Sequence, residues 1–161
     1  MHIKNLTLEE KIGQMLCFAF NGTEYNEQLD RQIKQLKVGG VIYFAKNITS
    51  PFQAAKLNER LQKEAKIPLF TCIDQEGGSV LRVMEKITPF PGAMGLAATG
   101  KSIRNLCYHV AKDLKSIGFN LNHAPVADVN NNPLNPVINS RSYSDDPEVV
   151  AKYVCEAFKG F

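Results

Sequence analysis

The sequence contains no long hydrophobic run. No segment approaches the roughly 18 consecutive apolar residues that a membrane-spanning helix needs. The first residues lead directly into a helix signal at Thr7, and no apolar stretch with a small-residue cleavage site precedes it. These absences exclude a membrane partner and give no sign of secretion, so we expect a cytoplasmic protein.

Blocks of charge of one sign are also absent. The formal net charge is only +3, and lysine and arginine are interspersed with acidic residues. A nucleic-acid partner is therefore not expected. With 44% hydrophobic and 22% charged residues, the chain of 161 residues has the composition of one soluble globular domain.

Cysteine pairs at metal-binding spacing are missing as well. Cys17, Cys72, Cys107 and Cys155 are far apart and form no C-x-x-C motif, so neither a zinc site nor a thioredoxin-like site is indicated. Each lies among apolar neighbours, which indicates reduced thiols that act as small hydrophobic residues. We predict no metal ion and no cofactor.

Helix and strand signals alternate about four times along the chain. Thr7 to Glu10 form a capping box, and Ser50 followed by Pro51 is a helix N-cap with proline at the first helical position. Strands joined by connections of crossover length pair in parallel, so the sequence predicts an α/β fold with a parallel sheet. The first expected helix starts at Thr7, three more cover about residues 27–37, 50–65 and 102–116, and a last helix is capped by Asp145 or Asp146. The expected strands cover residues 15–20, 41–45, 67–73 and 119–126.

Two architectures fit this alternation: a small doubly wound sheet and half of a (β/α)₈ barrel. Irregular segments rich in helix breakers follow the third and fourth expected strands, after Arg82 and from Asn130 to Tyr143. Long loops thus follow strands and short turns follow helices, which is typical of a barrel whose functional loops lie at the carboxyl ends of its strands. The sequence favours the first half of a (β/α)₈ barrel of the TIM type, with about four parallel strand–helix units.

The stretch that follows the third expected strand is the candidate functional region. There an apolar run ends abruptly in Asp74, Glu76 and the glycine pair Gly77-Gly78. Binding and catalytic groups of parallel α/β folds lie at the carboxyl ends of strands. Because Asp74 and Glu76 are two residues apart, they point to opposite sides of an extended chain, and only one should face a ligand. The glycines allow another segment to approach closely, whereas an anion or nucleotide site there is a weak alternative without a fuller G-x-G-x-x-G or Walker pattern.

Three ordered motifs resemble the amino-terminal barrel domain of glycoside hydrolase family 3. They are IDQEGGSVLR at residues 73–82, NHAPVADV at 122–129 and NPVINSRSY at 135–143. The likeness runs from about Leu6 to Phe161, and the nearest branch resembles the bacterial β-N-acetylhexosaminidases. Ser79 is a departure, because the family usually has arginine after the paired glycines, and this puts any ion pair of that arginine in question.

The resemblance implies that Asp74 binds substrate and that Arg82 and Arg141 donate hydrogen bonds to it. A carboxylate accepts bonds from two neighbouring sugar hydroxyls, and a guanidinium group presents a planar fork of donors. Asp74 could instead cap a local N–H, and either arginine could hold a loop by pairing with Asp74, Glu76 or Asp128. We interpret Glu76, Asp128, His109 and His123 as structural rather than catalytic residues.

No catalytic residue is assigned in this chain. By the resemblance, the family takes its nucleophilic aspartate from a later strand, and the hexosaminidase branch transfers protons with a histidine backed by an aspartate, after a Lys-His-Phe-Pro-Gly-His-type segment. None of these motifs occurs in the sequence. A retaining glycosidase needs two such groups about 5 Å apart, so we expect residues 1–161 to be catalytically incomplete.

The sequence therefore predicts a single partial domain, residues 1–161, from a retaining β-N-acetylhexosaminidase that acts on terminal N-acetylglucosamine. The resemblance implies a sugar or muropeptide that contains N-acetylglucosamine as the ligand, and a role in cell-wall recycling. Half a barrel exposes its edge strands, so self-association through these edges is expected. The alternative is a non-catalytic carbohydrate-binding or regulatory module.

Overall fold

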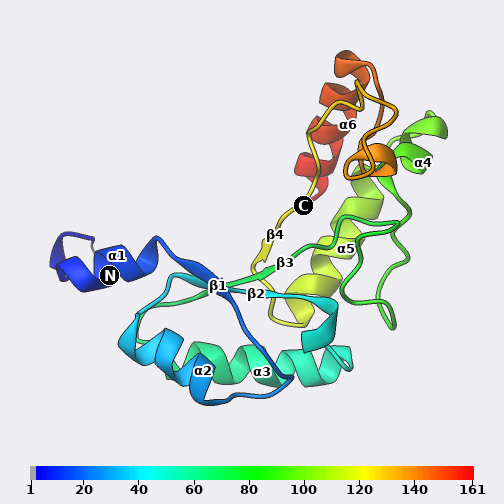
Figure 1. The fold of residues 1–161 in the computed structure, drawn as a ribbon. Helices are drawn as coiled ribbons and strands as arrows, with labels where there is room; N and C mark the ends of the chain where they lie inside the picture. The colour runs from blue at the N-terminus through cyan, green and yellow to red at the C-terminus, as the bar shows by residue number, and fades with distance from the viewer. Residues whose placement is uncertain (1–2) are drawn as a thin grey trace. The chain divides into compact units, whose positions relative to one another are not determined.

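The computed structural model describes residues 3–161, so residues 1 and 2 of the predicted domain lie outside the described residues. The chain, coloured by residue number in Figure 1, divides into two compact units. The first unit runs to Ile73 and includes Ser116–Asn122, and the second consists of Asp74–Lys115 and His123–Phe161. The sheet belongs to the first unit and the candidate functional region to the second.

The first unit is built on a four-stranded parallel sheet in the order β1-β2-β3-β4. The strands are β1 (Cys17–Ala19), β2 (Gly40–Tyr43), β3 (Phe70–Ile73) and β4 (Leu121–Asn122). Every pairing between neighbouring strands is parallel, and the spatial order follows the chain. The predicted α/β fold with four parallel strands is therefore confirmed.

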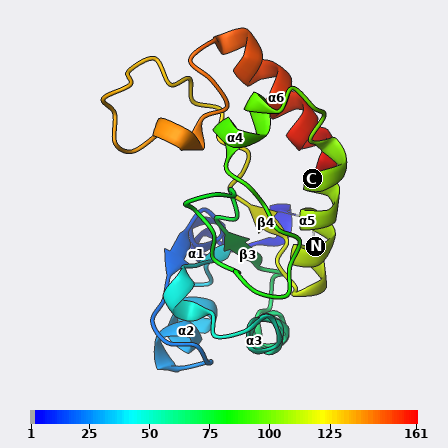
Figure 2. The same ribbon diagram turned by 90° about the vertical axis from the view of Figure 1, so that its right-hand side faces the viewer.

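Short helices and α3 complete the first unit. The predicted capping box is present, because Glu10 N donates to the Thr7 hydroxyl at 3.2 Å and Thr7 N donates to the Glu10 carboxylate at 2.9 Å. Figures 1 and 2 show α2 and α3 side by side along the sheet. The helical elements are η1 (Ile3–Asn5), α1 (Leu8–Gln14), α2 (Glu27–Asp30) with its π-helical continuation η2 (Arg31–Gln35), η3 (Ala45–Asn47) and α3 (Pro51–Glu64).

The two faces of the sheet differ in burial. On one face Val41, Tyr43 and Ile73 are 0% exposed, and the Tyr43 ring packs edge-on against Phe20 and Phe119 at centroid distances of 4.8 and 5.0 Å. This face holds the core of the first unit. Side chains alternate along a strand, and the other face carries Phe70, which is 56% exposed, and the exposed Cys17 and Ala19. Within residues 3–161 this second face, called the open face below, is the less covered one, although Cys72 on it is buried.

The fourth strand is shorter than the predicted residues 119–126. Before it, the Asn120 side chain accepts from Thr71 N and donates to Leu69 O, both at 2.8 Å, while Asn120 N donates to Thr71 O at 3.3 Å, so side-chain bonds take part in the pairing there in place of a regular ladder. After it, Pro125 has no N–H to donate. Only Leu121–Asn122 therefore pairs as a regular strand.

The second unit is helical. It contains α4 (Ala93–Ala98), α5 (Arg104–Ser116), η4 (Asn139–Arg141) and α6 (Pro147–Gly160), and the Asp146 side chain caps α6 as one of the two predicted caps. Helix α4 lies in the segment after Arg82 that we predicted to be irregular, so that prediction is wrong there. A tertiary contact accounts for this helix: the Tyr153 hydroxyl of α6 donates a hydrogen bond to Ala97 O at 3.1 Å, and Figure 2 shows α4 beside α6. No helix within residues 3–161 has the length and apolarity needed to cross a membrane.

Asn47 is a buried polar residue that closes the loops after β1 and β2. Its side chain is 0% exposed. The amide nitrogen donates to Phe20 O at 3.1 Å and to Gly22 O at 2.9 Å, and the amide oxygen accepts from Phe44 N at 2.9 Å. Backbone groups that leave a parallel sheet need partners when water is excluded, and Asn47 supplies three of them.

We predict that Asn47→Ala lowers the free energy of unfolding by about 2–4 kcal/mol, because it removes several buried hydrogen bonds and leaves their partners unsatisfied. Urea unfolding followed by circular dichroism measures the change. Asn105→Ala, at an exposed position of α5, is the control and should alter the free energy by less than about 0.5 kcal/mol. Equal effects of the two substitutions would contradict the role assigned to Asn47.

Candidate functional site

A tight reversal of the chain follows β3. Glu76 N and Gly77 N both donate to Val80 O, at 3.0 and 3.2 Å, and Val80 N donates to Gly77 O at 3.2 Å. The backbone therefore folds back directly after the carboxyl end of the strand. As a result, Asp74 at the start of the segment lies within ion-pair distance of Arg82 at its end.

The glycine pair makes this reversal possible. Gly77 and Gly78 have φ angles of +97° and +59°, in the left-handed region that favours glycine. A Cβ atom at Gly77 would lie 2.3 Å from Pro91 O, and one at Gly78 would lie 2.7 Å from the Cα atom of Gly92. The predicted close approach of another segment to these glycines is therefore confirmed.

The amide groups of the two glycines are used within the chain. Gly77 N donates to Val80 O and Gly78 N donates to Phe90 O at 3.0 Å. An anion or nucleotide site at a glycine pair depends on backbone N–H groups that point to the ligand. These hydrogen bonds argue against the weak alternative of such a site.

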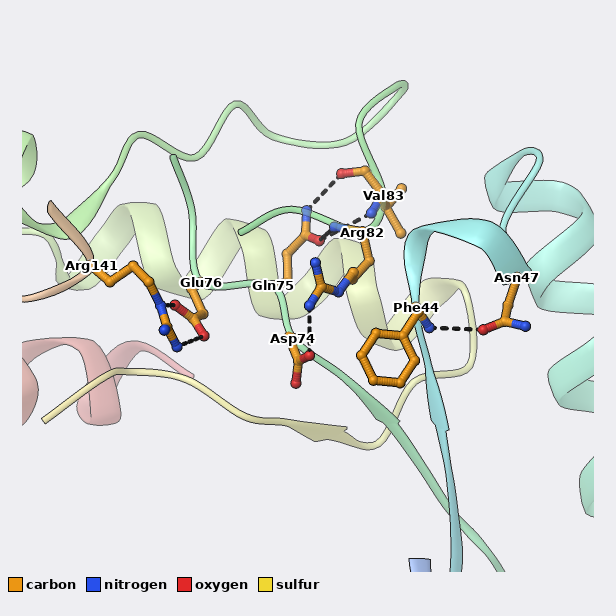
Figure 3. A network of polar contacts seen from close by, with 8 residues as sticks. All are labelled: Phe44, Asn47, Asp74, Gln75, Glu76, Arg82, Val83 and Arg141. Carbon is orange, nitrogen blue, oxygen red and sulfur yellow. Dashed lines mark hydrogen bonds and ion pairs between the residues drawn. The ribbon is translucent and has the colours of Figure 1, made fainter. Parts of the chain in front are cut away.

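Asp74 and Arg82 form an ion pair. Arg82 Nη2 lies 2.9 Å from Asp74 Oδ2, as the dashed line in Figure 3 shows. The side chains of Arg82 and Asp74 are only 20% and 18% exposed, so water screens this pair less than it screens an ion pair on the open surface. The arrangement presents a carboxylate and a guanidinium group together at the end of β3.

Glu76 and Arg141 form a second ion pair with bidentate geometry. Arg141 Nε lies 2.8 Å from Glu76 Oε2, and Nη2 lies 2.8 Å from Oε1. Arg141 Nη1 also donates to Val137 O at 3.1 Å. The hydrogen bonds to Glu76, and secondarily its negative charge, raise the pKa of the Arg141 guanidinium above its ordinary value. Figure 3 shows that this pair links the segment after β3 to the Asn130–Tyr143 loop.

The structure places all the predicted site residues in the second unit. Asp74 pairs with Arg82 and Glu76 pairs with Arg141, so the two carboxylates take different partners. The sequence analysis allowed an alternative in which either arginine pairs with an acidic residue and holds a loop, and both arginines do form such ion pairs. The assignment of Asp74, Arg82 and Arg141 to substrate binding stays a prediction.

The other polar residues that we singled out lie outside these two pairs. Ser79 is exposed, and Asp74 and Glu76 find their arginines at Arg82 and Arg141 without an arginine at position 79. Asp128 accepts a hydrogen bond from the Ser142 hydroxyl through its backbone carbonyl at 2.6 Å. His109 and His123 are exposed.

Gln75 is the residue that our sequence interpretation missed. It lies between the two carboxylates in the chain, and its side chain is 0% exposed. Its oxygen accepts from Arg82 N and Val83 N at 2.9 and 3.1 Å, and its nitrogen donates to Val83 O at 2.7 Å. The sequence signal that could have indicated its role is the position of an uncharged amide residue within a strand-end motif rich in charged residues and glycine.

Cysteine thiols and other possible metal ligands are distributed over the described part of the chain. Among residues 3–161, no three His, Cys, Asp or Glu side chains gather as metal ligands would. Cys72 and Cys107 are buried as predicted, and burial raises the pKa of the Cys107 thiol to about 11. All four cysteines are free thiols, but Cys17 and Cys155 are exposed and so do not act as buried hydrophobic residues.

Comparison with known proteins places the chain in a family. The model of the glycosyl hydrolase family 3 N terminal domain matches residues 7–161. The chain belongs to glycosyl hydrolase family 3. It is 40% identical to Beta-hexosaminidase A of Pseudoalteromonas piscicida, in a match that covers 97% of the chain and 31% of the relative. It is 32% identical to the Beta-hexosaminidase of Photobacterium profundum, over 86% of the chain and 42% of that protein.

Solved structures of family 3 proteins are similar to this chain. A family 3 beta-N-acetylglucosaminidase from Paenibacillus sp. str. FPU-7 gives a TM-score of 0.94 at 42% sequence identity, over 97% of this chain and 31% of that one. A Beta-N-acetylhexosaminidase from Beutenbergia cavernae gives a TM-score of 0.87 at 25% identity, over 97% of this chain and 50% of that one. The family 3 chain thus spans half or less of the length of these relatives.

Family membership confirms the fold class that the sequence favoured. The four parallel strands alternate with helices in the order expected for the first half of a (β/α)₈ barrel, and the family 3 structures match them along nearly the whole chain. The doubly wound alternative is therefore set aside.

We predict that Glu76→Gln loosens the Asn130–Tyr143 loop, because the amide keeps the shape of the carboxylate but loses its charge and one of its two acceptor atoms. Local opening of this loop should become easier by about 1.5–3 kcal/mol, the range for hydrogen bonds to charged groups. Amide hydrogen exchange of residues 137–143 measures the change.

Glu85→Gln, at an exposed position of the same segment, is the matched control for this substitution. It removes the same charge without touching Arg141, so exchange of residues 137–143 should stay as in the parent chain. Similar exchange rates in Glu76→Gln and Glu85→Gln would show that the bidentate pair does not hold the loop.

Proposed function

We propose that this chain contributes the sugar-binding part of a retaining β-N-acetylhexosaminidase that acts on terminal N-acetylglucosamine. The observation that carries the proposal is the Asp74–Arg82 ion pair at the carboxyl end of β3, in a chain of family 3. Relatives with these names, a Beta-hexosaminidase and a beta-N-acetylglucosaminidase, support the substrate class. Both compact units would belong to one partial barrel domain over residues 1–161, since a single family model spans residues 7–161.

Asp74 is proposed to accept hydrogen bonds from sugar hydroxyls. A carboxylate has two oxygens, and Arg82 pairs with Oδ2. We assign Oδ1 to a hydroxyl of the terminal sugar. Arg82 would then hold the carboxylate in one orientation and donate from the same guanidinium plane to a neighbouring oxygen of the ligand.

Arg141 is proposed to donate to the ligand while it remains paired with Glu76. A guanidinium group has five N–H donors. Bonds to Glu76 and Val137 O use three of them, one on each nitrogen. The second hydrogens of Nη1 and Nη2 are the donors that we assign to an amide or hydroxyl oxygen of N-acetylglucosamine. Glu76 would fix the guanidinium plane and remain outside the ligand contacts.

The finer parts of the proposal concern the natural ligand and the pathway. The family resemblance supports a muropeptide or another sugar that contains N-acetylglucosamine, a role in cell-wall recycling and a cytoplasmic location. A non-catalytic carbohydrate-binding or regulatory module is the second candidate. It would keep Asp74, Arg82 and Arg141 as the sugar-binding residues.

Titration of the 161-residue chain with N-acetylglucosamine, followed by amide NMR, tests the proposal. We expect weak, saturable binding that Asp74→Ala reduces by at least about tenfold, since lost bonds to a charged group are worth about 1.4 kcal/mol or more. Asp145→Ala, at an exposed aspartate, is the matched control and should bind as the parent chain does. Equal binding by the two variants, or none by the parent chain, would contradict the site.

Hydrolysis of an aryl N-acetylglucosaminide by the same preparation separates the chemistry from binding. We expect no hydrolysis, because a retaining mechanism needs a nucleophile and an acid/base group that the sequence motifs do not provide. Detectable turnover by the purified chain would overturn the assignment of no catalytic residue. Binding without turnover is common to both candidate functions.

We also propose that the chain self-associates through its sheet. The open face carries Phe70 and exposed small residues, and each of β1 and β4 has a neighbouring strand on one side only. Light scattering should detect species larger than a monomer that increase with protein concentration. Phe70→Glu should shift the distribution to monomer, whereas Phe158→Glu, at a side chain of α6 that is 76% exposed, should not. A monomeric parent chain at all concentrations would contradict the proposal.

A further inference from the structure

Gln75 joins both ends of the segment that carries the proposed sugar-binding pair. Its backbone follows Asp74 directly, and its side chain bonds to the backbone of Arg82 and Val83, seven and eight residues later. Figure 3 shows the Gln75 amide joined by dashed lines to Arg82 and Val83, with the Asp74–Arg82 ion pair beside it. Of the two residues that form the ion pair, Asp74 directly precedes Gln75 and Arg82 is bonded to the Gln75 amide through its backbone N–H.

The chemistry of these three hydrogen bonds requires a side-chain amide. Two backbone N–H groups point at one end of the Gln75 side chain and one carbonyl oxygen at the other. The amide oxygen has two acceptor sites and the NH₂ group donates, so glutamine meets all three partners. A carboxylate has no hydrogen for Val83 O, and a lysine or arginine has no acceptor for the N–H groups.

Burial makes this amide a rigid connection rather than a surface contact. The Gln75 side chain is 0% exposed, and Val83 is 1% exposed. A buried amide that lost these partners would find no water in their place. Conformations in which these hydrogen bonds are broken are therefore strongly disfavoured. The backbone of Arg82 is therefore fixed at its N–H, and the guanidinium group extends from that fixed point to Asp74 at 2.9 Å.

We propose that Gln75 is a positioning residue that sets the Arg82 guanidinium against Asp74 and thereby orients the carboxylate for the sugar. Gln75 acts through the Arg82 backbone and does not itself touch the ligand. The inference rests on the proposed sugar-binding function of Asp74 and Arg82. It adds a residue that determines how well this pair recognises a terminal sugar.

Gln75→Met tests the inference in the 161-residue chain, because methionine has a similar length but offers no amide. Gln62→Met is the matched control. The Gln62 amide makes the same kind of connection before β3, donating to Leu69 O at 2.8 Å and accepting from Leu69 N at 3.1 Å. Both substitutions remove a side-chain amide that bridges backbone groups, but only one lies beside the ion pair.

Two measurements are made on each variant: N-acetylglucosamine affinity by NMR titration, and the order of the Arg82 side chain from ¹⁵N relaxation of its Nε–H signal. We expect Gln75→Met to weaken binding by about tenfold, equivalent to about 1.4 kcal/mol, and to make the Arg82 Nε–H signal mobile. Gln62→Met should lower the melting temperature while it leaves both the affinity and the Arg82 signal unchanged.

The two readouts separate the failure of this inference from the failure of the proposed function. If the parent chain does not bind the sugar, the proposed function fails, and the Arg82 signal alone decides the role of Gln75. An Arg82 side chain as ordered in Gln75→Met as in the parent chain overturns the inference, as does unchanged affinity with only a lower melting temperature. If Gln75→Met does not fold, Gln75→Asn replaces it, because its amide is one methylene too short to keep all three bonds, and the same two criteria apply.

Discussion

Buried side-chain amides that pair with backbone groups beyond the strand ends are the interaction on which the rest of the structure depends. Parallel strands end where their loops begin, and there the backbone N–H and C=O groups lose the partners that the sheet provides. Asn47 supplies partners for three backbone groups around β1 and β2, and Gln75 does the same for the segment after β3. Both side chains are 0% exposed, so water cannot take over this role. Loops held in this way can present charged side chains in a fixed geometry.

The two carboxylates after β3 illustrate how one short segment separates two tasks. Asp74 and Glu76 have the same charge and are separated by one residue only, yet each pairs with a different arginine. Glu76 binds Arg141 through both oxygens, a geometry that uses the carboxylate fully and ties two distant loops together. Asp74 binds Arg82 through Oδ2, which leaves it suited to a second partner. The structural role and the proposed binding role therefore follow from how many oxygens each arginine occupies.

Much of the fold follows from local signals. The capping box at Thr7, the serine–proline start at residue 50 and the aspartate–proline start of α6 begin helices in the structure where the sequence predicts them, because these caps need only groups two or three residues apart. Helix α4 and the shortness of β4, which was predicted over residues 119–126, could not be read from the sequence, since the Tyr153–Ala97 and Asn120–Thr71 hydrogen bonds join residues about 50 positions apart. Local propensity carries no information about such partners.

The sequence by itself determined the parallel α/β class, the family resemblance and the stretch after β3 as the candidate site, because each depends on residue types at fixed short spacings. Tertiary structure alone decided which arginine pairs with which carboxylate. Arg141 and Glu76 are 65 positions apart, and their ion pair exists only because the folded backbone brings Arg141 Nε within 2.8 Å of Glu76 Oε2. It also decided that Gln75, an uncharged residue between two acids, is fully buried and bound to the backbone beside Arg82. A hydrogen bond depends on tenths of an ångström and on orientation, and only the packed chain sets these.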